Sequence, residues 1–313
     1  MISGFAKSQG VGRYPLLVVG TVAIDSVETP FGRKDAVFGG SASYFSYAAS
    51  FFAPVELVAV VGEDFPKDYR RILEERRIGL DHLEIARGKT FHWKGKYGSD
   101  LNTALTLDTQ LNVLLGFKPK LKSDREPQYL FLANIDPDLQ LEVLNQVKRP
   151  KCRLVACDTM NYWIGGKRTK LGQVLKRVDM VVINDGEARL LAGEPNLIKA
   201  ARKIQTMGPG TVIIKKGEHG ALLFHDGQFF ILPAYPLEDV FDPTGAGDSF
   251  AGGVMGYLAK TGDLGFDNLK KAVVHGAMIA SFTVEDFGLE RLRTLRDREL
   301  EERLDDFRKI CLF

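Results

Sequence analysis

The sequence predicts an α/β protein, a three-layer α/β/α sandwich with a mostly parallel sheet. Two observations predict this class: short, fully apolar runs recur along the chain, and amphipathic helical stretches separate them. Strands buried on both faces and joined by helices are typical of parallel sheets that helices cover on each side. As a third observation, two segments rich in aromatic residues and threonine interrupt this alternation of strands and helices, and they predict a small additional β-sheet.

The buried strands are expected at residues 16–20, 57–61, 129–132, 154–157, 180–183 and 212–215. The intervening helices are expected at residues 66–78, 138–147, 169–176, 186–191 and 197–207. After Asp248 the pattern is helical to the end of the chain, and its last part, residues 296–309, predicts a solvated surface helix with interleaved charges. Ligands of such sheets bind beyond the carboxyl ends of the strands, so the strand-to-helix turns are the candidate sites of chemistry.

The two irregular segments are residues 26–38 and 90–109, and each contains a turn signal, at residues 30–32 and 98–102. Each segment predicts an antiparallel strand pair rather than a helix. Together they predict a small β-sheet lid inserted in a single domain that spans residues 1–313.

Composition excludes several classes of protein. The 313 residues are 45% hydrophobic and 26% charged, which is typical of a globular chain and excludes a disordered or fibrous one. A net charge of +2 disfavours a nucleic-acid partner. Three cysteines form neither a disulfide framework nor a zinc pattern, and the first 15 residues contain no apolar run of signal-peptide length. We therefore expect a soluble, cytoplasmic protein without a membrane partner.

The strongest chemical signal is the segment Asp-Pro-Thr-Gly-Ala-Gly-Asp-Ser-Phe at residues 242–250. Its turn, Gly245-Ala246-Gly247, leads directly into a helical pattern, so backbone N–H groups converge where the helix dipole is positive. Such a turn suits a phosphate. Asp248 would repel a phosphate but suits a hydroxyl that attacks one, and its place near a helix N-terminus predicts a lowered pKa. An ordinary glycine-rich turn is the alternative.

The ordered set of motifs resembles the ribokinase/PfkB family of small-molecule kinases. Residues 242–250 resemble the C-terminal signature of that family, residues 20–25 its first strand with a substrate-binding aspartate, and residues 39–42 its N-terminal Gly-Gly signature. Residues 62–64, 184–187 and 215–217 resemble its Gly-Asp-Asp motif, its Asn-x-x-Glu motif and its nucleotide-strand turn. The resemblance covers essentially the whole chain. It implies a ribokinase-like sandwich with a β lid, and transfer of the γ-phosphate of ATP to a hydroxymethyl group of a nucleoside or sugar.

The resemblance also implies roles for single residues. The implied catalytic residues are Asp248, Gly245, Ala246 and Gly247. The substrate-binding candidates are Asp25, Gly39, Gly40, Ser41 and Tyr44, to which position after a strand adds Asn134, Asp136 and Asp158. The nucleotide-binding candidates are Asn184, Lys215, Gly217, Gly220, Thr244 and His275. Glu187 is implied near magnesium, and Asp242 matches a position that holds a monovalent cation such as potassium in some members.

Each assignment has a structural alternative. Asp25 could form a salt bridge or a helix cap, Asn184 and Glu187 match the capping-box pattern, and His275 lies on an apolar helix where core packing is common. The sequence lacks a G-x-x-x-x-G-K-[ST] loop, a G-x-G-x-x-G turn after the first strand, a G-x-S-x-G elbow and an H-E-x-x-H motif. A non-catalytic nucleotide or sugar sensor on the same fold stays open as an alternative, although Asp248 favours an enzyme.

The substrate is where the chain departs from the family pattern. Tyr44 stands where the family usually has an asparagine that holds the sugar. The lid is aromatic, with Phe38, Phe91, Trp93 and Tyr97. These rings could stack a nucleobase or a hexose face, or form the apolar seam of a homodimer made through the lid. The exchange of donors for flat apolar surface favours a nucleoside over a sugar, and the sugar kinase is the alternative.

Overall fold

The main body is built on a nine-stranded sheet. The computed structural model describes residues 14–122 and 126–311, so the N-terminal segment considered above for a leader falls almost entirely outside the described residues. The strand order is β13-β12-β11-β10-β9-β8-β1-β4-β5. The strands are β1 (Leu16–Val19), β4 (Val55–Gly62), β5 (Gly79–Ala86), β8 (Tyr129–Leu132), β9 (Leu154–Cys157), β10 (Met180–Asn184), β11 (Thr211–Lys215), β12 (Ala221–His225) and β13 (Gln228–Leu232). Pairing is parallel from β5 to β11 and antiparallel at β12 and β13, which confirms the mostly parallel sheet.

The sheet separates two apolar cores. Successive residues of β1 alternate between them: Leu16 and Val18 belong to one core, Leu17 and Val19 to the other. This alternation explains why the central strands read as continuous apolar runs, since both faces of each strand are buried.

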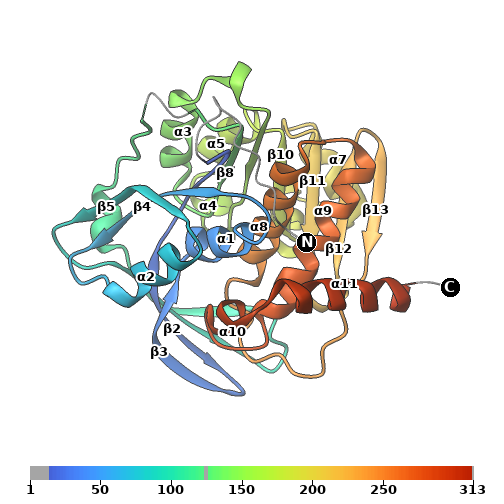
Figure 1. The fold of residues 1–313 in the computed structure, drawn as a ribbon. Helices are drawn as coiled ribbons and strands as arrows, with labels where there is room; N and C mark the ends of the chain where they lie inside the picture. The colour runs from blue at the N-terminus through green and yellow to red at the C-terminus, as the bar shows by residue number, and fades with distance from the viewer. Residues whose placement is uncertain (1–13, 123–125, 312–313) are drawn as a thin grey trace.

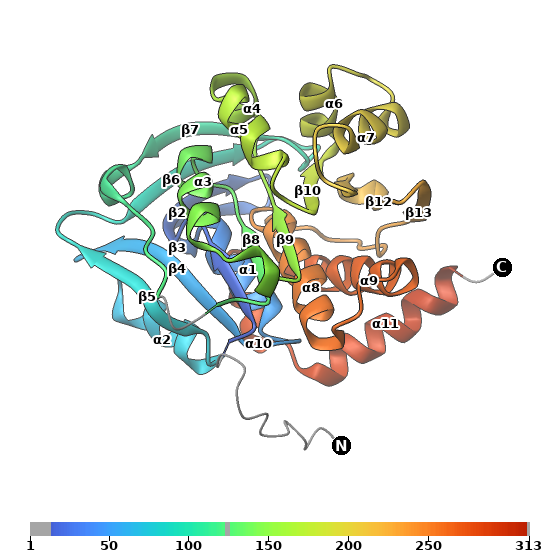
Figure 2. The same cartoon turned by 90° about the horizontal axis from the view of Figure 1, so that it is seen from above.

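Helices form a layer on each face of the sheet (Figure 2). One layer contains α1 (Ser41–Ala49), α2 (Lys67–Glu75), α8 (Ala246–Thr261), α9 (Phe266–Thr283), α10 (Glu290–Thr294) and α11 (Asp297–Cys311). The other contains α3 (Pro137–Gln146), α4 (Asn161–Gly166), α5 (Arg168–Leu175), α6 (Asp185–Ala192) and α7 (Leu197–Gln205). The predicted three-layer sandwich is confirmed. Among the described residues, none of the helices has the length and apolar character that crossing a bilayer requires.

A separate four-stranded sheet forms the lid, with the order β3-β2-β6-β7 (Figure 1). Its strands are β2 (Ala23–Thr29), β3 (Gly32–Gly39), β6 (Phe91–Tyr97) and β7 (Ala104–Gln110). The pairs β2–β3 and β6–β7 are antiparallel, as expected, and β2 joins β6 in parallel. Asp25 lies inside β2, so the expectation that it closes the first strand is wrong. The first strand ends at Val19, before the chain passes into the lid.

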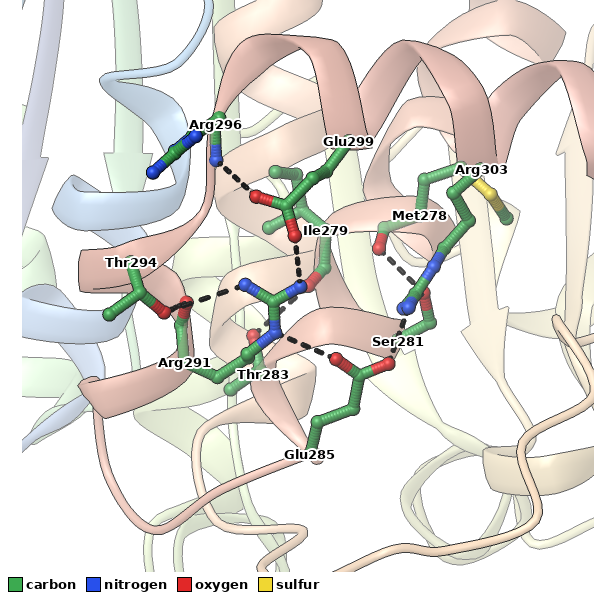
Figure 3. Close-up of polar contacts among 10 residues, drawn as sticks. All are labelled: Met278, Ile279, Ser281, Thr283, Glu285, Arg291, Thr294, Arg296, Glu299 and Arg303. Carbon is green, nitrogen blue, oxygen red and sulfur yellow. Dashed lines mark hydrogen bonds and ion pairs between the residues drawn. The ribbon is translucent and has the colours of Figure 1, made fainter.

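The charged C-terminal segment forms the surface helix α11, which charged side chains join to the end of α9 (Figure 3). Arg291 Nε donates to Glu285 at 2.9 Å and Arg291 Nη2 to Glu299 at 2.7 Å. Arg303 also pairs with Glu285, and its guanidinium lies 3.4 Å from the centre of the Phe282 ring. Because Glu285 follows α9 directly, this charged cluster fixes the start of the loop that continues through residue 288.

Candidate active site

Polar residues gather at the carboxyl ends of neighbouring parallel strands. Asp158 follows β9, Asn184 ends β10 and Lys215 ends β11. These strands are adjacent in the sheet, so the three residues lie at one edge, as the parallel topology predicts. The N-terminus of α8 faces the same edge, because Asp248 in its first turn interacts electrostatically with both Asp158 and Lys215.

We call residues 242–248 the anion turn. Gly245 precedes α8 with φ 75°, a left-handed conformation that favours glycine. A Cβ atom at this position would lie 2.3–2.4 Å from three atoms of the Tyr44 ring, so the glycine backbone is in contact with the ring. Gly247 has no such positive φ, and a Cβ there would meet Lys215 Nζ at 2.8 Å. The left-handed position in the turn is therefore Gly245.

Asp242 fixes the beginning of the anion turn and is fully buried. One of its carboxylate oxygens accepts the Thr244 N–H at 2.9 Å and the other accepts the Gly288 N–H at 3.1 Å. Burial raises the pKa of Asp242, and these backbone donors partly oppose that effect. The carboxylate thus braces the turn against the loop after α9, and potassium at this residue stays a prediction.

The charges around the anion turn contradict the predicted pKa of Asp248. The pKa of Asp248 is raised well above its ordinary value, first by burial and then by the negative charges of Asp158 and Glu187, while Lys215 opposes the change. The expectation of a pKa lowered by the helix dipole is therefore wrong, because desolvation and like charges outweigh the dipole. With its pKa raised, Asp248 is a stronger base than a dipole-stabilised carboxylate.

Lys215 is the cation within this acidic group. Its Nζ lies 3.7 Å from Asp158 Oδ2, with the charges of Glu187 and Asp248 also nearby. Burial works against its charged form, but the three carboxyl groups outweigh burial and raise the pKa of Lys215. The lysine is therefore held charged beside the anion turn, where a phosphate would meet it.

Asn184 and Glu187 form the capping box of α6. Asn184 Oδ1 accepts the Glu187 N–H at 2.7 Å, and the Glu187 carboxylate accepts the Asn184 N–H at 2.8 Å. The structural alternative thus holds, yet Glu187 also belongs to the acidic group. Burial and Asp158 raise its pKa to about 7 against the effect of Lys215.

On the lid side, Asp25 faces the two glycines of the N-terminal signature. A Cβ on Gly39 would lie 1.8 Å from Asp25 Oδ2, and one on Gly40, where φ is 96°, would lie 2.5 Å from the Thr21 carbonyl oxygen. Both positions therefore exclude a larger residue. Burial raises the pKa of Asp25 to about 7, with the backbone of Gly40 opposing. Its Oδ1 is buried and accepts no hydrogen bond from the described residues.

Two tyrosines connect this carboxyl group to the anion turn. The Tyr44 hydroxyl is buried, has no hydrogen-bond partner among the described residues, and lies within electrostatic range of Asp25, Asp242, Tyr97 and Asp248. The Tyr97 hydroxyl accepts a hydrogen bond from Thr244 Oγ1 at 3.2 Å. The aromatic pattern of the lid predicted neither contact, because it gives no information on where a hydroxyl points.

Several predicted residues have partners within the fold, and their binding roles stay predictions. Asp136 caps α3 and pairs with Lys167 at 2.6 Å. The Asn134 side chain accepts from Trp163 Nε1 at 3.0 Å and donates to Met160 Sδ at 3.2 Å.

Two more predicted residues, Ser41 and His275, also have partners within the fold. The Ser41 hydroxyl bonds to Thr21 and to the Asn134 carbonyl oxygen. His275 stacks on Tyr257, a residue in the C-terminal half of α8, with 4.2 Å between the ring centres. Burial lowers the pKa of the His275 imidazole to about 4. The structure thus places His275 in a packed aromatic cluster, as the core-packing alternative predicts, and a contact with the nucleotide stays a prediction.

The turn after β11 touches the lid. Gly217 has φ 54°, and a Cβ there would lie 2.2 Å from Oδ1 of Asn102, in the turn between β6 and β7. Gly220 has φ 84°, and a Cβ there would meet the Leu232 carbonyl oxygen at 1.9 Å, so this glycine allows the β12–β13 hairpin to pack. Sequence reasoning missed Asn102, since a polar residue in a turn carries no distinctive signal.

The acidic group was tested as a magnesium site. Within residues 14–122 and 126–311, no three His, Cys, Asp or Glu side chains are arranged to hold a metal ion by themselves. Magnesium commonly binds through one or two carboxylates, water and substrate phosphates. The residues therefore fit an ion that arrives with a nucleotide, with Glu187 and Asp158 as the nearby carboxyl groups.

The anion turn lies at a helix N-terminus, at the carboxyl end of a parallel sheet, and a carboxyl group carried by the lid lies opposite it. This arrangement defines the class of ribokinase-like phosphotransferases. Within that class, the chain belongs to the pfkB family of carbohydrate kinases, whose model matches residues 33–294. It is 32% identical over 243 residues to the cytidine kinase of Thermococcus kodakarensis, covering 77% of this chain and 87% of that protein.

Solved structures share the fold. The Methanocaldococcus jannaschii nucleoside kinase superposes with a TM-score of 0.73 at 21% identity, covering 95% of this chain and all of that one. A ribokinase-like protein of E. coli, solved with ATP and Mg²⁺, gives 0.75 at 17% identity, covering 94% and 99%. The chain is accordingly an ATP-dependent kinase that phosphorylates an alcohol group of a nucleoside or sugar.

Proposed function

We propose that this kinase is a nucleoside kinase that phosphorylates the hydroxymethyl group of the ribose, with cytidine as the first candidate acceptor. The observation that carries the proposal is the pairing of Asp25 with Trp93 in the lid sheet. Residues directly opposite each other in a parallel pair project from the same face of the sheet. A carboxyl group for ribose hydroxyls therefore stands beside a large flat ring for a base.

The face that carries Trp93 is the one turned toward the body. Alternate residues of β6 share a face, so Phe91, Trp93 and Tyr97 lie together, and Tyr97 reaches the anion turn. Phe91 and Trp93 are half-buried, whereas Phe38 is buried against Tyr69 with 4.9 Å between ring centres. Phe38 and Tyr97 thus follow the packing alternative. Trp93 packs on Val27, Tyr97 and Phe287 with part of its ring, and the exposed parts of Phe91 and Trp93 are what a base would contact.

In the proposed reaction, the anion turn binds the γ-phosphoryl group. The acceptor hydroxyl oxygen bonds to the γ-phosphorus as the bond to the β–γ bridging oxygen breaks, Asp248 accepts the hydroxyl proton and ADP leaves. Lys215 balances the phosphate charge, and Glu187 and Asp158 are the carboxyl groups that would hold a magnesium ion, which would stabilise the charge on the phosphates. Positioning and charge stabilisation supply most of the catalysis in phosphoryl transfer. Asp25, with an unpaired buried oxygen, accepts hydroxyl donors of the acceptor, which lowers the cost of burying it.

The similarity to a cytidine kinase supports the nucleoside over a free sugar. The sugar kinase stays the second candidate, because the match to the carbohydrate-kinase model spans most of the chain. A non-catalytic sensor is not favoured, since Asp248, Lys215 and the anion turn are all present together.

The test is a screen of acceptors by ADP release, using cytidine, other nucleosides, ribose, hexoses and inositol. The variant Trp93→Leu should raise the KM for a nucleoside by about 10-fold, the loss of one base–ring stack, and leave the KM for ribose unchanged. Lys94→Ala is the matched control: Lys94 follows Trp93 in β6, so it projects from the opposite lid face. Free ribose or a hexose turned over as efficiently as any nucleoside would contradict the proposal.

The predicted homodimer and potassium dependence stay part of this proposal. All seven residues of β7, the outer strand of the lid, are exposed, including Leu105 and Leu107. An exposed strand edge with apolar side chains favours pairing with a second chain. Sedimentation of the protein and of Leu105→Asp tests the dimer, and replacing potassium by sodium in the assay tests the cation.

A further inference from the structure

The lid makes a direct hydrogen bond to the anion turn. The hydroxyl oxygen of Tyr97, the last residue of β6, accepts a hydrogen bond from Thr244 Oγ1 at 3.2 Å. The two residues are 147 positions apart in the chain. Both side chains are buried. Thr244 immediately precedes Gly245, the residue with φ 75° from which α8 starts.

The backbone of the turn on either side of Thr244 is already fixed from the body. The Thr244 N–H donates to Asp242, and the Ser249 N–H donates to the Gly245 carbonyl oxygen at 2.8 Å. Gly245 itself is in contact with the ring of Tyr44. The Thr244 side chain also interacts with Asp242. The hydrogen bond to Tyr97 therefore adds a second contact to this side chain, and it is the one that comes from the lid.

The lid also touches the loop that braces the turn from behind. Tyr97 forms a small apolar cluster with Val27 of β2 and with Phe287, and Trp93 packs on this cluster. Phe287 is followed by Gly288, whose N–H donates to Asp242 at 3.1 Å. One tyrosine therefore contacts the anion turn through its hydroxyl and the bracing loop through its ring.

We propose that Tyr97 is a positioning residue for phosphoryl transfer: its hydroxyl holds Thr244 so that the backbone N–H groups of the anion turn are aligned only when the lid sheet is seated on the body. This links the sheet that carries Asp25 and Trp93 to the turn that binds the phosphoryl group. The inference rests on the proposed role of the anion turn and does not depend on which acceptor is used.

The test compares two tyrosine hydroxyls that both join the lid to the body. Tyr97→Phe removes the bond to the anion turn. Tyr69→Phe, the matched control, removes the bond from α2 to the Ala36 carbonyl oxygen in β3, which does not involve the anion turn. With cytidine and ATP, we expect kcat to fall about 5-fold in Tyr97→Phe, the effect of one neutral hydrogen bond, with the KM for ATP unchanged. Tyr69→Phe should leave kcat unchanged.

A double-mutant cycle separates positioning from a general loss of stability. Thr244→Val removes the donor, so the double variant Tyr97→Phe/Thr244→Val should be no slower than Thr244→Val alone. Thr244→Ser keeps the donor and should retain the rate. Additive losses, or an equal loss in Tyr69→Phe, would overturn the inference.

Hydrogen–deuterium exchange supplies a readout without any acceptor. The amides of residues 244–248 should exchange faster in Tyr97→Phe than in the parent chain, and at the parent rate in Tyr69→Phe. If no acceptor in the screen is turned over, the proposed function fails while this exchange experiment still decides the inference. Equal exchange in the parent chain and in Tyr97→Phe would refute it.

Discussion

Gly245 and Tyr44, residues from opposite ends of the chain, are in direct contact, and a Cβ on the glycine would lie within 2.4 Å of three ring atoms of the tyrosine. The residue that departs from the family pattern thus contacts the most constrained residue of the anion turn. Tyr44 takes up the space beside the turn, and its buried hydroxyl lies within electrostatic range of Asp25 and Asp248. The same contact makes the turn intolerant of any side chain at position 245.

We predict that Gly245→Ala is much more damaging than Gly193→Ala. Gly193 also has a left-handed φ, 61°, but nothing lies within 4 Å of its virtual Cβ. Gly193→Ala should therefore cost only the conformational strain, about 1–2 kcal/mol. Gly245→Ala adds overlap with a buried ring, worth about 1–3 kcal/mol more. Urea unfolding of the two variants measures both values, and equal losses would contradict the contact.

We predict that Asp248→Asn lowers kcat by at least about 100-fold, the usual effect of losing a general base. Binding of a non-hydrolysable ATP analogue should survive, because the backbone of the turn is unchanged. Asp185→Asn is the matched control: this aspartate also lies in the first turn of a helix but pairs with Arg189 at the surface. A near-normal kcat in Asp248→Asn would remove Asp248 from the mechanism.

We predict that the ligand-free protein becomes less stable as the pH rises from about 4.5 to 7. Burial raises the pKa of Glu187 from 4.5 to about 7, so the folded state holds this proton more tightly than the unfolded state does. The folded state is therefore favoured below pH 4.5 and loses up to about 3 kcal/mol from this group by pH 7. Asp25, with its pKa raised to about 7, acts in the same direction.

Glu187→Gln tests this pH dependence, because glutamine preserves the capping box. Urea unfolding at pH 5, 6 and 7 should show a weaker loss of stability in Glu187→Gln than in the parent chain. Glu301→Gln, an exposed change on α11, is the control. An identical pH dependence in all three proteins would show that Glu187 ionises normally.

We predict that Glu285→Ala destabilises the protein by about 1–3 kcal/mol, between the values for exposed and buried ion pairs. Glu285 pairs with two arginines, and its side chain is 22% exposed. Removal leaves Arg291 and Arg303 without this partner. Glu302→Ala, which breaks an exposed pair with Arg298, should have a much smaller effect. Comparable losses in the thermal unfolding of both variants would be inconsistent with a stabilising role of the half-buried charged cluster.

The sequence predicted the elements whose signal is local. Strands such as β9 and β10 are buried on both faces and therefore appear as unbroken apolar runs. It did not predict β5, whose residues are half exposed along the strand, so no apolar run marks it. It also missed the short helix α4, which has a single buried residue, Ile164.

For the site, the motifs located the residues but not their partners. Glu187 and Lys215 come together because the parallel strands β10 and β11 end at one edge, which topology alone predicts, whereas Asp248 reaches that edge from the first turn of α8. The pKa of Asp248 is raised, whereas the sequence predicted that it is lowered. Burial and the two neighbouring carboxyl groups cause the increase, and both depend on packing that no motif encodes. Tyr97 and Asn102 reach the site from the lid, and long-range contacts of this kind leave no periodic pattern.

The lid is discontinuous along the chain, and this governs how it can assemble. Its two hairpins are separated by α1, β4, α2 and β5, all parts of the body, and only the parallel pairing of β2 with β6 unites them. An isolated two-stranded hairpin is marginal in water, and closing the long intervening loop costs entropy until the body has folded. The lid sheet should therefore be completed late in folding, after β4 and β5 have paired. For the same reason, transplanting a lid from one kinase of this fold to another requires exchanging both segments together.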